Sequence, residues 1–251
     1  MAGHSKWSNI KHKKAATDAK RGKLWSKLSK AIMVAAKNGG SDLDVNVRLR
    51  TLVADARAAS MPKDNIARAI KKGAGELDQV NFEEIIYEGY GPGGVAVMCD
   101  ILTDNRNRTS PELKKLFEKS GGKMGATGCV GYLFERKGLF VIPTENADEE
   151  KLMEVAMEAG AEDIATVDDN FEVTCEPESY SAVSEALEAA EVACESKQVT
   201  RIPGNTVDLN SGDAIKVLKM MDELDDHDDV QNVSSNFNIS DEVMAEISDK
   251  I

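Results

Sequence analysis

The sequence predicts an α+β protein in which an N-terminal all-α helical domain is followed by two ferredoxin-like α/β domains, one inserted in the other. Three observations support this prediction. Apolar residues recur every three or four positions up to about residue 73, which is typical of helices. Beyond residue 84 short strand patterns alternate with helical ones. The charge changes sign at the same place: residues 1–75 hold 17 Lys and Arg against 5 acids, and residues 76–251 hold 14 against 39.

The N-terminal segment predicts a basic arm followed by helices. Residues 1–14 have no apolar period, so we expect an arm that is mobile until it binds a partner. A helical pattern begins at Ala15, and Gly22 is expected to separate a short first helix from a longer second one. The pair Gly39-Gly40 marks the end of that second helix.

Two further helices and a linker complete the helical domain. A helix over roughly 45–60 is expected to be capped by Asp42 or Asp44. A third helix over 62–72 starts with a proline, which suits the first helical turn. Residues 74–84 predict a linker.

The next stretch changes to strands. The motif GYGPGG (89–94) predicts a turn between two strands, because it lacks the Lys-Ser/Thr ending of a phosphate-binding loop. Thr109 and Glu112 form a capping box at the start of a helix that ends at Gly121-Gly122. The strands are expected at 85–87, 95–101 and 129–135.

The pattern that follows is β-α-β-β-α-β, the order of a ferredoxin-like unit. The later elements should pair with 94–135 into a second unit of this kind, which the first interrupts. The inserted elements are expected at 139–143, 148–159, 163–167, 171–175, 179–190 and 192–201, and the later ones at 206–209, 211–224 (capped by Ser211), 230–239 and 241–248. The predicted domains are therefore 1–75, 76–135 plus 205–251, and the insertion 136–204.

Composition excludes several classes of protein. No apolar run approaches the roughly 20 residues of a membrane span, and no apolar stretch follows the basic N-terminus as in a secretory signal. The four cysteines are far apart and form no C-x-x-C, which favours reduced thiols and a cytoplasmic location.

The charge of the first thirty residues points to a nucleic acid or another polyanion, since nine Lys and Arg face a single acid there. Cations would contact phosphates, and an aromatic side chain among them would stack on an unpaired base. A solvated tail with a polar helix face is the alternative. The candidates are Lys6, Trp7, Lys11, His12, Lys13, Lys14, Lys20, Arg21, Lys23 and Lys27.

A second candidate contact is DNRNRT (104–109), which lies between a strand and a helix. Arg106 and Arg108 could present guanidinium groups to phosphate beside a helix N-terminus. Alternatively, Asp104 pairs with these arginines and merely holds the loop.

Nothing in the sequence indicates catalysis, a metal or a cofactor. His4 and His12 lack a third ligand, and the acidic run 222–229 lacks the spacing of an EF-hand loop. We therefore expect a non-enzymatic protein. The rival is a phosphate-handling enzyme that uses GYGPGG and DNRNRT, which a nucleotide-hydrolysis assay would reveal.

Five strings carry a resemblance to a known family: MAGHSKW (1–7), the KAA-x-DAKRGK run (14–23), YEGYGPGG (87–94), DNRNRT (104–109) and DDVQNV (228–233). In these the chain resembles the YebC/PmpR family over nearly its whole length. One departure is His227, which lengthens the acidic stretch before DDVQNV.

The resemblance implies three domains and a cytoplasmic regulator of gene expression that binds nucleic acid. Bacterial members are described as probable transcriptional regulators that bind DNA. The mitochondrial relative is described as a translational activator, and other work on the family points to the ribosome, including relief of stalling at proline-rich stretches. The residues themselves favour backbone and shape recognition, because Asn and Gln are few on the basic helices. Such recognition suits structured RNA, whereas the description of the bacterial members favours DNA. DNA is the first candidate partner on the strength of that description, and ribosomal or transfer RNA is the alternative.

Overall fold

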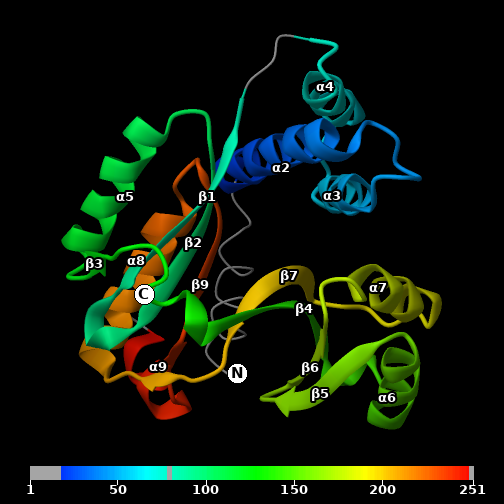
Figure 1. Ribbon diagram of the computed structural model, residues 1–251. Coiled ribbons are helices and arrows are strands. Elements are labelled where there is room, and N and C mark those ends of the chain that lie inside the picture. Colours follow the sequence, from blue (N-terminus) through cyan, green and yellow to red (C-terminus); the bar gives the residue numbers. More distant parts are fainter. Residues whose placement is uncertain (1–17, 78–80, 249–251) are drawn as a thin grey trace.

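The computed structural model describes residues 18–77 and 81–248, with the side chains of residues 18–20 left aside (Figure 1). Its first part is helical: α2 (Asp18–Gly39), α3 (Val47–Ala58) and α4 (Lys63–Gly73). Both short helices pack against the C-terminal part of α2 around buried aliphatic side chains. This core includes Ile32, Leu49 and Ile66, which the 3.6-residue period places on facing surfaces.

Two details of this helical part differ from the prediction. Gly22 does not divide the first helix, because α2 runs through it without a break. Neither Asp42 nor Asp44 caps α3, since the cap is Asn46, whose side chain accepts a hydrogen bond from the Leu49 N–H at 3.0 Å. The buried Asn46 amide also donates to the carbonyls of Ala35 and Gly40, both at 2.8 Å. One side chain therefore ties the end of α2 to the start of α3.

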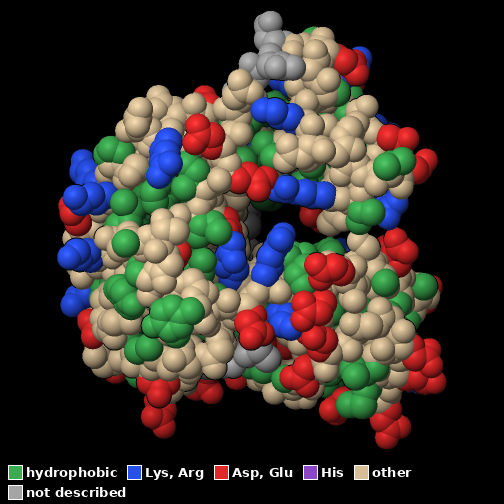
Figure 2. All heavy atoms as spheres, viewed as in Figure 1, with side chains coloured by type: hydrophobic (Ala, Val, Ile, Leu, Met, Phe, Trp, Pro, Cys, Tyr) green, Lys and Arg blue, Asp and Glu red, His purple; other side chains and the backbone are tan. Residues whose placement is uncertain are grey.

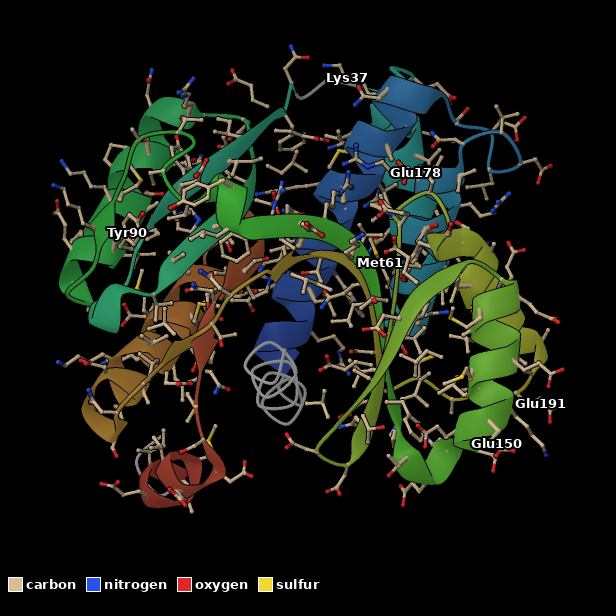
Figure 3. The ribbon with its side chains drawn as sticks, turned by 60° about the horizontal axis from the view of Figure 1, so that its bottom comes forward. Lys37, Met61, Tyr90, Glu150, Glu178 and Glu191 are labelled. Carbon is tan, nitrogen blue, oxygen red and sulfur yellow. The ribbon has the colours of Figure 1, made fainter. Side chains whose placement is uncertain are left out.

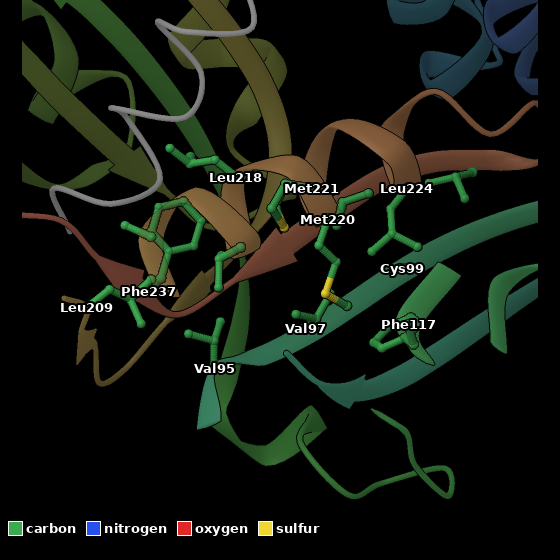
Figure 4. Packing of buried hydrophobic residues seen from close by; sticks show 14 of the residues in the cluster. Val95, Val97, Cys99, Phe117, Leu209, Leu218, Met220, Met221, Leu224 and Phe237 are labelled. Carbon is green, nitrogen blue, oxygen red and sulfur yellow. The ribbon is translucent and has the colours of Figure 1, made fainter. Parts of the chain in front are cut away.

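The first sheet has the strand order β3-β1-β2-β9, with all neighbours antiparallel. Its strands are β1 (Glu83–Tyr90), β2 (Ala96–Thr103), β3 (Lys123–Met124) and β9 (Val230–Ser235). The helices α5 (Arg106–Lys119) and α8 (Ser211–Asp225) cover one face (Figure 1). Figure 4 shows Met220 and Met221 of α8 above Val97 and Cys99 of β2, inside the largest buried cluster of the described chain.

This sheet is not the β-α-β-β-α-β unit that the sequence predicts. The strand β1 occupies the place between β3 and β2, and β8 (Val207–Asp208) does not join the sheet. Instead, β8 pairs in parallel with β10 (Phe237–Asn238), because the expected strand 230–239 breaks after Ser235. The last helix, α9 (Asp241–Ile247), then closes over α8.

The helix caps here also differ from the prediction. The helix α5 starts three residues before Thr109, with Asn105 as its cap. The helix α8 is capped by Asn210, and Ser211 is its first residue. In both cases an Asn side chain accepts from the backbone N–H three residues on, which satisfies a donor at the helix start.

The second sheet has the order β5-β6-β4-β7 and is antiparallel throughout. Tyr180 of α7 stacks on Phe140 of β4, with ring centroids 5.0 Å apart, in the core between this sheet and its two helices. The elements are β4 (Phe134–Pro143), α6 (Glu149–Glu158), β5 (Ala161–Val167), β6 (Asn170–Cys175), α7 (Tyr180–Ala189) and β7 (Ser196–Pro203).

Two long strands connect the two sheets. The predicted strands 129–135 and 139–143 are replaced by the single strand β4, so the predicted boundary between residues 135 and 136 falls inside it. Its neighbour β7 reaches the first sheet, where Arg201 donates to Asp100 of β2 at 2.9 Å. The division of the chain into three domains stays a prediction. Among the described helices, none has the length and apolar character that a membrane crossing requires.

Candidate nucleic-acid interface

The predicted basic arm, residues 1–14, lies outside the described residues. The structure therefore assigns no position to six of the candidates, and it leaves the side chain of Lys20 undescribed. These six are Lys6, Trp7, Lys11, His12, Lys13 and Lys14. Three of the other candidates lie on α2, and two lie on α5.

The lysines of α2 are directed at the C-terminal end of α8. Lys23 Nζ lies 3.3 Å from Asp226 Oδ2, and Lys27 Nζ lies 3.3 Å from Asp225 Oδ1. One turn further along α2, Lys30 Nζ contacts Asp229 Oδ1 at 2.7 Å. All three ammonium groups also donate to backbone carbonyls, those of Asp226, Asp225 and Asp228. We call these residues the lysine–aspartate contact.

The position of this contact has a physical cause. The last carbonyls of α8 have no partner within the helix, and the helix dipole places partial negative charge there. Ammonium groups from α2 pair with the carbonyls and neutralise the partial negative charge. The carboxylates of the aspartates that follow add full negative charges. Lys23 and Lys27, predicted as phosphate ligands, are therefore engaged within the chain, which attaches the helical part to the first sheet.

Arg21 remains at the surface. Its guanidinium lies 5.8 Å from the centre of the Trp25 ring, within the range of a cation–π contact. The Trp25 indole N–H in turn donates to the Ala59 carbonyl at 2.9 Å, which fixes the ring against the end of α3. Arg21 is thus exposed to solvent, and its guanidinium faces Trp25 rather than the end of α8.

The two arginines of DNRNRT have different surroundings. Both belong to the first turn of α5 rather than to a loop. Arg108 contacts Asp229 at 2.7 Å and Asp104 at 3.2 Å, so the internal pairing that the sequence left open is present at this residue. Arg106 is exposed and forms no ion pair with any described residue.

Asp229 is the centre of this region. Its side chain is 2% exposed, and its Oδ2 accepts from Thr109 at 2.7 Å and from Thr103 at 3.1 Å, in addition to Arg108. Burial alone would raise the pKa of this carboxyl. The hydrogen bonds from Lys30, Thr109 and Arg108 outweigh that effect and hold the pKa well below its ordinary value. Asp229 is therefore an anion that joins α2, α5 and β9.

The prediction missed a set of cations on α3 and α4. These side chains are exposed and form no ion pair with the described part of the chain. They contribute to the positive charge of residues 1–75, but no local pattern distinguishes them from the cations that pair within the chain. On α3 the two members are seven residues apart and share one face of the helix. The set consists of Arg50, Arg57, Lys63, Arg68 and Lys71.

The acids and cations lie on different parts of the surface. In Figure 2, acidic side chains dominate the part formed by the second sheet, α6 and α7. Lys and Arg side chains gather along α5 and around the opening in the middle of the molecule. Within residues 18–77 and 81–248, no group of three or more His, Cys, Asp or Glu side chains could hold a metal ion.

Comparisons with known proteins agree along the whole chain. Residues 5–76 match the family model described as the TACO1/YebC protein N-terminal domain, and residues 82–237 match the one described as the TACO1/YebC second and third domain. A probable transcriptional regulatory protein of Rhodopirellula baltica is 57% identical over 247 residues, which cover 98% of this chain and all of that protein. Another, from Natranaerobius thermophilus, is 56% identical and covers 97% of this chain and 99% of its own.

A solved structure is similar as well. The crystal structure of a conserved hypothetical protein from Aquifex aeolicus superimposes with a TM-score of 0.83 at 51% identity. The match covers 92% of this chain and 96% of that one.

Proposed function

Because the chain belongs to the TACO1/YebC family, we propose that it is a non-enzymatic regulator of gene expression that binds nucleic acid. The basic arm and the exposed cations of α3 and α4 make the main contact in this proposal, and residues 1–75 act as the binding domain. The observation that carries it is the set Arg50, Arg57, Lys63, Arg68 and Lys71, which is exposed and has no internal partner among the described residues. Cations left unpaired on one part of an acidic protein suit a polyanion.

Double-stranded DNA is the first candidate partner. Its support is that relatives 50–57% identical over nearly the full chain are named probable transcriptional regulatory proteins. The geometry suits contacts to the DNA backbone, because Arg and Lys side chains on two neighbouring helices can meet successive phosphates.

RNA within a translation complex is the second candidate, and one observation favours it. The exposed long side chains of α3 and α4 are arginines and lysines, while Asn65 of α4 is half-buried. Adenine readout in the major groove uses Asn or Gln, so these helices are poorly equipped for it. Binding that depends on phosphate positions suits structured RNA, which proteins recognise largely by shape.

The test replaces three cations of α3 and α4 by glutamine in the full-length protein: Arg57, Arg68 and Lys71. If each contacts a phosphate, the slope of log affinity against log salt falls by about 2–3 for a duplex, and affinity at low salt falls by at least tenfold. A matched control neutralises Lys115, Lys151 and Lys219, which are exposed on α5, α6 and α8. Equal losses in both variants would mean that only net charge matters, and an unchanged slope in the first would refute the proposal.

The non-enzymatic part of the proposal has its own test. Purified protein is incubated with nucleoside triphosphates, with and without nucleic acid, and release of phosphate is measured. Turnover that survives rigorous purification and disappears when Arg106 is replaced would favour the rival phosphate-handling enzyme.

A further inference from the structure

The first sheet has one face that α5 and α8 leave free. Ile85 and Tyr87 of β1 pack on the helix-covered side. Because side chains alternate along a strand, Ile86, Glu88 and Tyr90 lie on the opposite face. Ile86 is 39% exposed there and Tyr90 is 40% exposed. We call this the open face.

A glycine-rich loop, residues 125–133, folds over one end of the open face. The buried Glu88 carboxylate accepts three backbone hydrogen bonds from this loop, from Gly128 and Gly131 at 2.7 Å and from Val130 at 2.8 Å. Burial tends to raise the pKa of Glu88, but these three N–H groups outweigh it and lower the pKa. The loop is therefore tied to the sheet by a carboxylate that stays ionised.

Two features give this loop one conformation. Its Val130 is fully buried and packs with Met98 of β2 and Phe134 of β4 in a small apolar cluster. Gly128 has φ +84°, a backbone conformation that residues with a side chain rarely adopt. A loop held in this way presents its remaining side chains without a large ordering cost on binding.

Tyr132 is the side chain that this loop presents. It is 77% exposed, more than any other large apolar side chain in the described part of the chain. Tyr90 is tied to the same loop, because its hydroxyl donates to the Cys129 carbonyl at 3.0 Å, three residues before Tyr132. Figure 3 labels Tyr90 at the surface of the first sheet. Both tyrosines are thus associated with one loop, and both side chains are exposed to solvent.

One cation lies beside Tyr90, and a second lies near the border of the open face. Lys123 of β3 lies directly opposite Tyr90 in the β1–β3 register, so the two side chains share the open face. Arg136 of β4 lies opposite Arg201, which reaches Asp100 at the border of the open face. Both Lys123 and Arg136 are exposed, and neither pairs with a described acid.

The acids of the same face are already engaged. Glu84 contacts Arg48 at 2.8 Å, Asp100 contacts Arg201 at 2.9 Å, and Glu88 holds the loop. The surface around the two tyrosines therefore combines exposed aromatic side chains with uncompensated positive charge. An unpaired nucleotide has the matching chemistry, since it offers a base to stack and a phosphate to neutralise. A closed duplex offers the phosphate but no base face.

We propose that Tyr132 and Tyr90 stack an unpaired nucleobase of a single-stranded nucleic acid, with Lys123 and Arg136 contacting its phosphates. Glu88 acts as the positioning residue that holds the loop. This site rests on the proposed function, nucleic-acid binding, and adds to it a preference for unpaired segments that the cations of α3 and α4 do not supply.

The test uses the full-length protein and a short single-stranded oligonucleotide with a central 2-aminopurine, whose fluorescence falls when it stacks. RNA and DNA versions are titrated in parallel with a hairpin of each, whose stem strands are joined by a non-nucleotide linker so that no base is unpaired. Tyr132→Ala should weaken single-strand binding about tenfold (~1.4 kcal/mol) and abolish the quenching, and it should leave hairpin binding and the melting temperature unchanged. Tyr132→Phe should behave as wild type, because it keeps the ring. The control Val45→Ala removes exposed apolar surface between α2 and α3 and should change nothing.

The outcomes separate this site from the proposed function. If Tyr132→Ala loses affinity for single-stranded RNA, for single-stranded DNA or for both, the stacking site is supported. The nucleic acid that shows the loss is the one whose unpaired bases the site accepts. Wild-type affinity in Tyr132→Ala, or an equal loss on single strands and hairpins, overturns it. If the wild-type protein binds hairpins with a steep salt dependence and Tyr132→Ala binds single strands as tightly as wild type, only the stacking site on the open face is refuted. If wild type binds no nucleic acid, the proposed function fails too.

Discussion

Replacing Asp229 by Asn should destabilise the protein strongly, because it removes the charge that two cations share. The Asp229 side chain is 2% exposed, whereas those of Lys30 and Arg108 are 16% and 46% exposed. Breaking a fully buried ion pair costs about 3–5 kcal/mol. Since Arg108 can return to water and Asn still accepts a bond from Thr109, we expect a smaller loss of about 2–3 kcal/mol. For a chain of this size that corresponds to a fall of about 5–10 °C in melting temperature.

The assay is thermal unfolding followed by circular dichroism, across a range of pH. The folded pKa of Asp229 is depressed, so its stabilisation is complete above the ordinary pKa of about 4 and is lost as the pH falls toward the folded value. The difference between wild type and variant should therefore be largest at neutral pH and shrink below pH ~4. Asp228→Asn is the matched control: its side chain is exposed, and Lys30 contacts its backbone carbonyl. A variant as stable as wild type at pH 7, or a difference independent of pH, would refute this reasoning.

Two further predictions concern single charges. Arg108→Ala should lower the melting temperature, since Arg108 contacts Asp229 and Asp104. Arg106→Ala should leave the melting temperature unchanged and weaken nucleic-acid binding. The reverse pattern in thermal unfolding and binding titrations would exclude Arg106 from the interface. Burial raises the pKa of Asp55 to about 6, against the opposing charge of Lys197. The ionised Asp55 carboxylate therefore destabilises the folded protein above pH ~6, whereas the protonated form below pH ~4 does not. In thermal unfolding, Asp55→Asn should stabilise the protein at pH 8 by about 1–2 kcal/mol, after allowance for partial exposure, and should give no gain at pH ~4.

Local signals in the sequence predicted the helices well where neighbouring residues decide the structure. The helix expected at 62–72 is found at 63–73, because Pro62 and the apolar spacing both act within one or two turns. The capping residues were predicted less well. Asn46 outcompetes Asp42 and Asp44 because its amide also bonds to the end of α2, a contact that helix α3 alone does not specify. Similarly, β1 enters the first sheet through pairing with β2 and β3, which strand patterns do not reveal.

The candidate site depended even more on distant contacts. The charge asymmetry located the basic part of the chain, but it did not indicate which cations would be neutralised internally. Lys27 and Asp225 are 198 residues apart, and no local pattern joins them. The same holds for Arg108 and Asp229, 121 residues apart, whereas the i, i+4 pair of Arg108 with Asp104 was open to prediction. Tyr132 is uncharged, so the charge pattern of the sequence does not indicate it as a nucleic-acid contact.

The internal pairing of α2 also bears on which cations dominate binding. A phosphate that reaches Lys23, Lys27 or Lys30 must displace a carboxylate and a backbone carbonyl at or just beyond the end of α8, so one set of oxygen partners is exchanged for another. A phosphate that reaches Arg57, Arg68 or Lys71 displaces water and counterions alone, and counterion release favours binding. At equal distance from the nucleic acid, the second group therefore contributes more free energy. The lysine–aspartate contact thus attaches the helical part to α8, and under the proposed function we expect α3 and α4, together with the arm, to be the surface that meets phosphate.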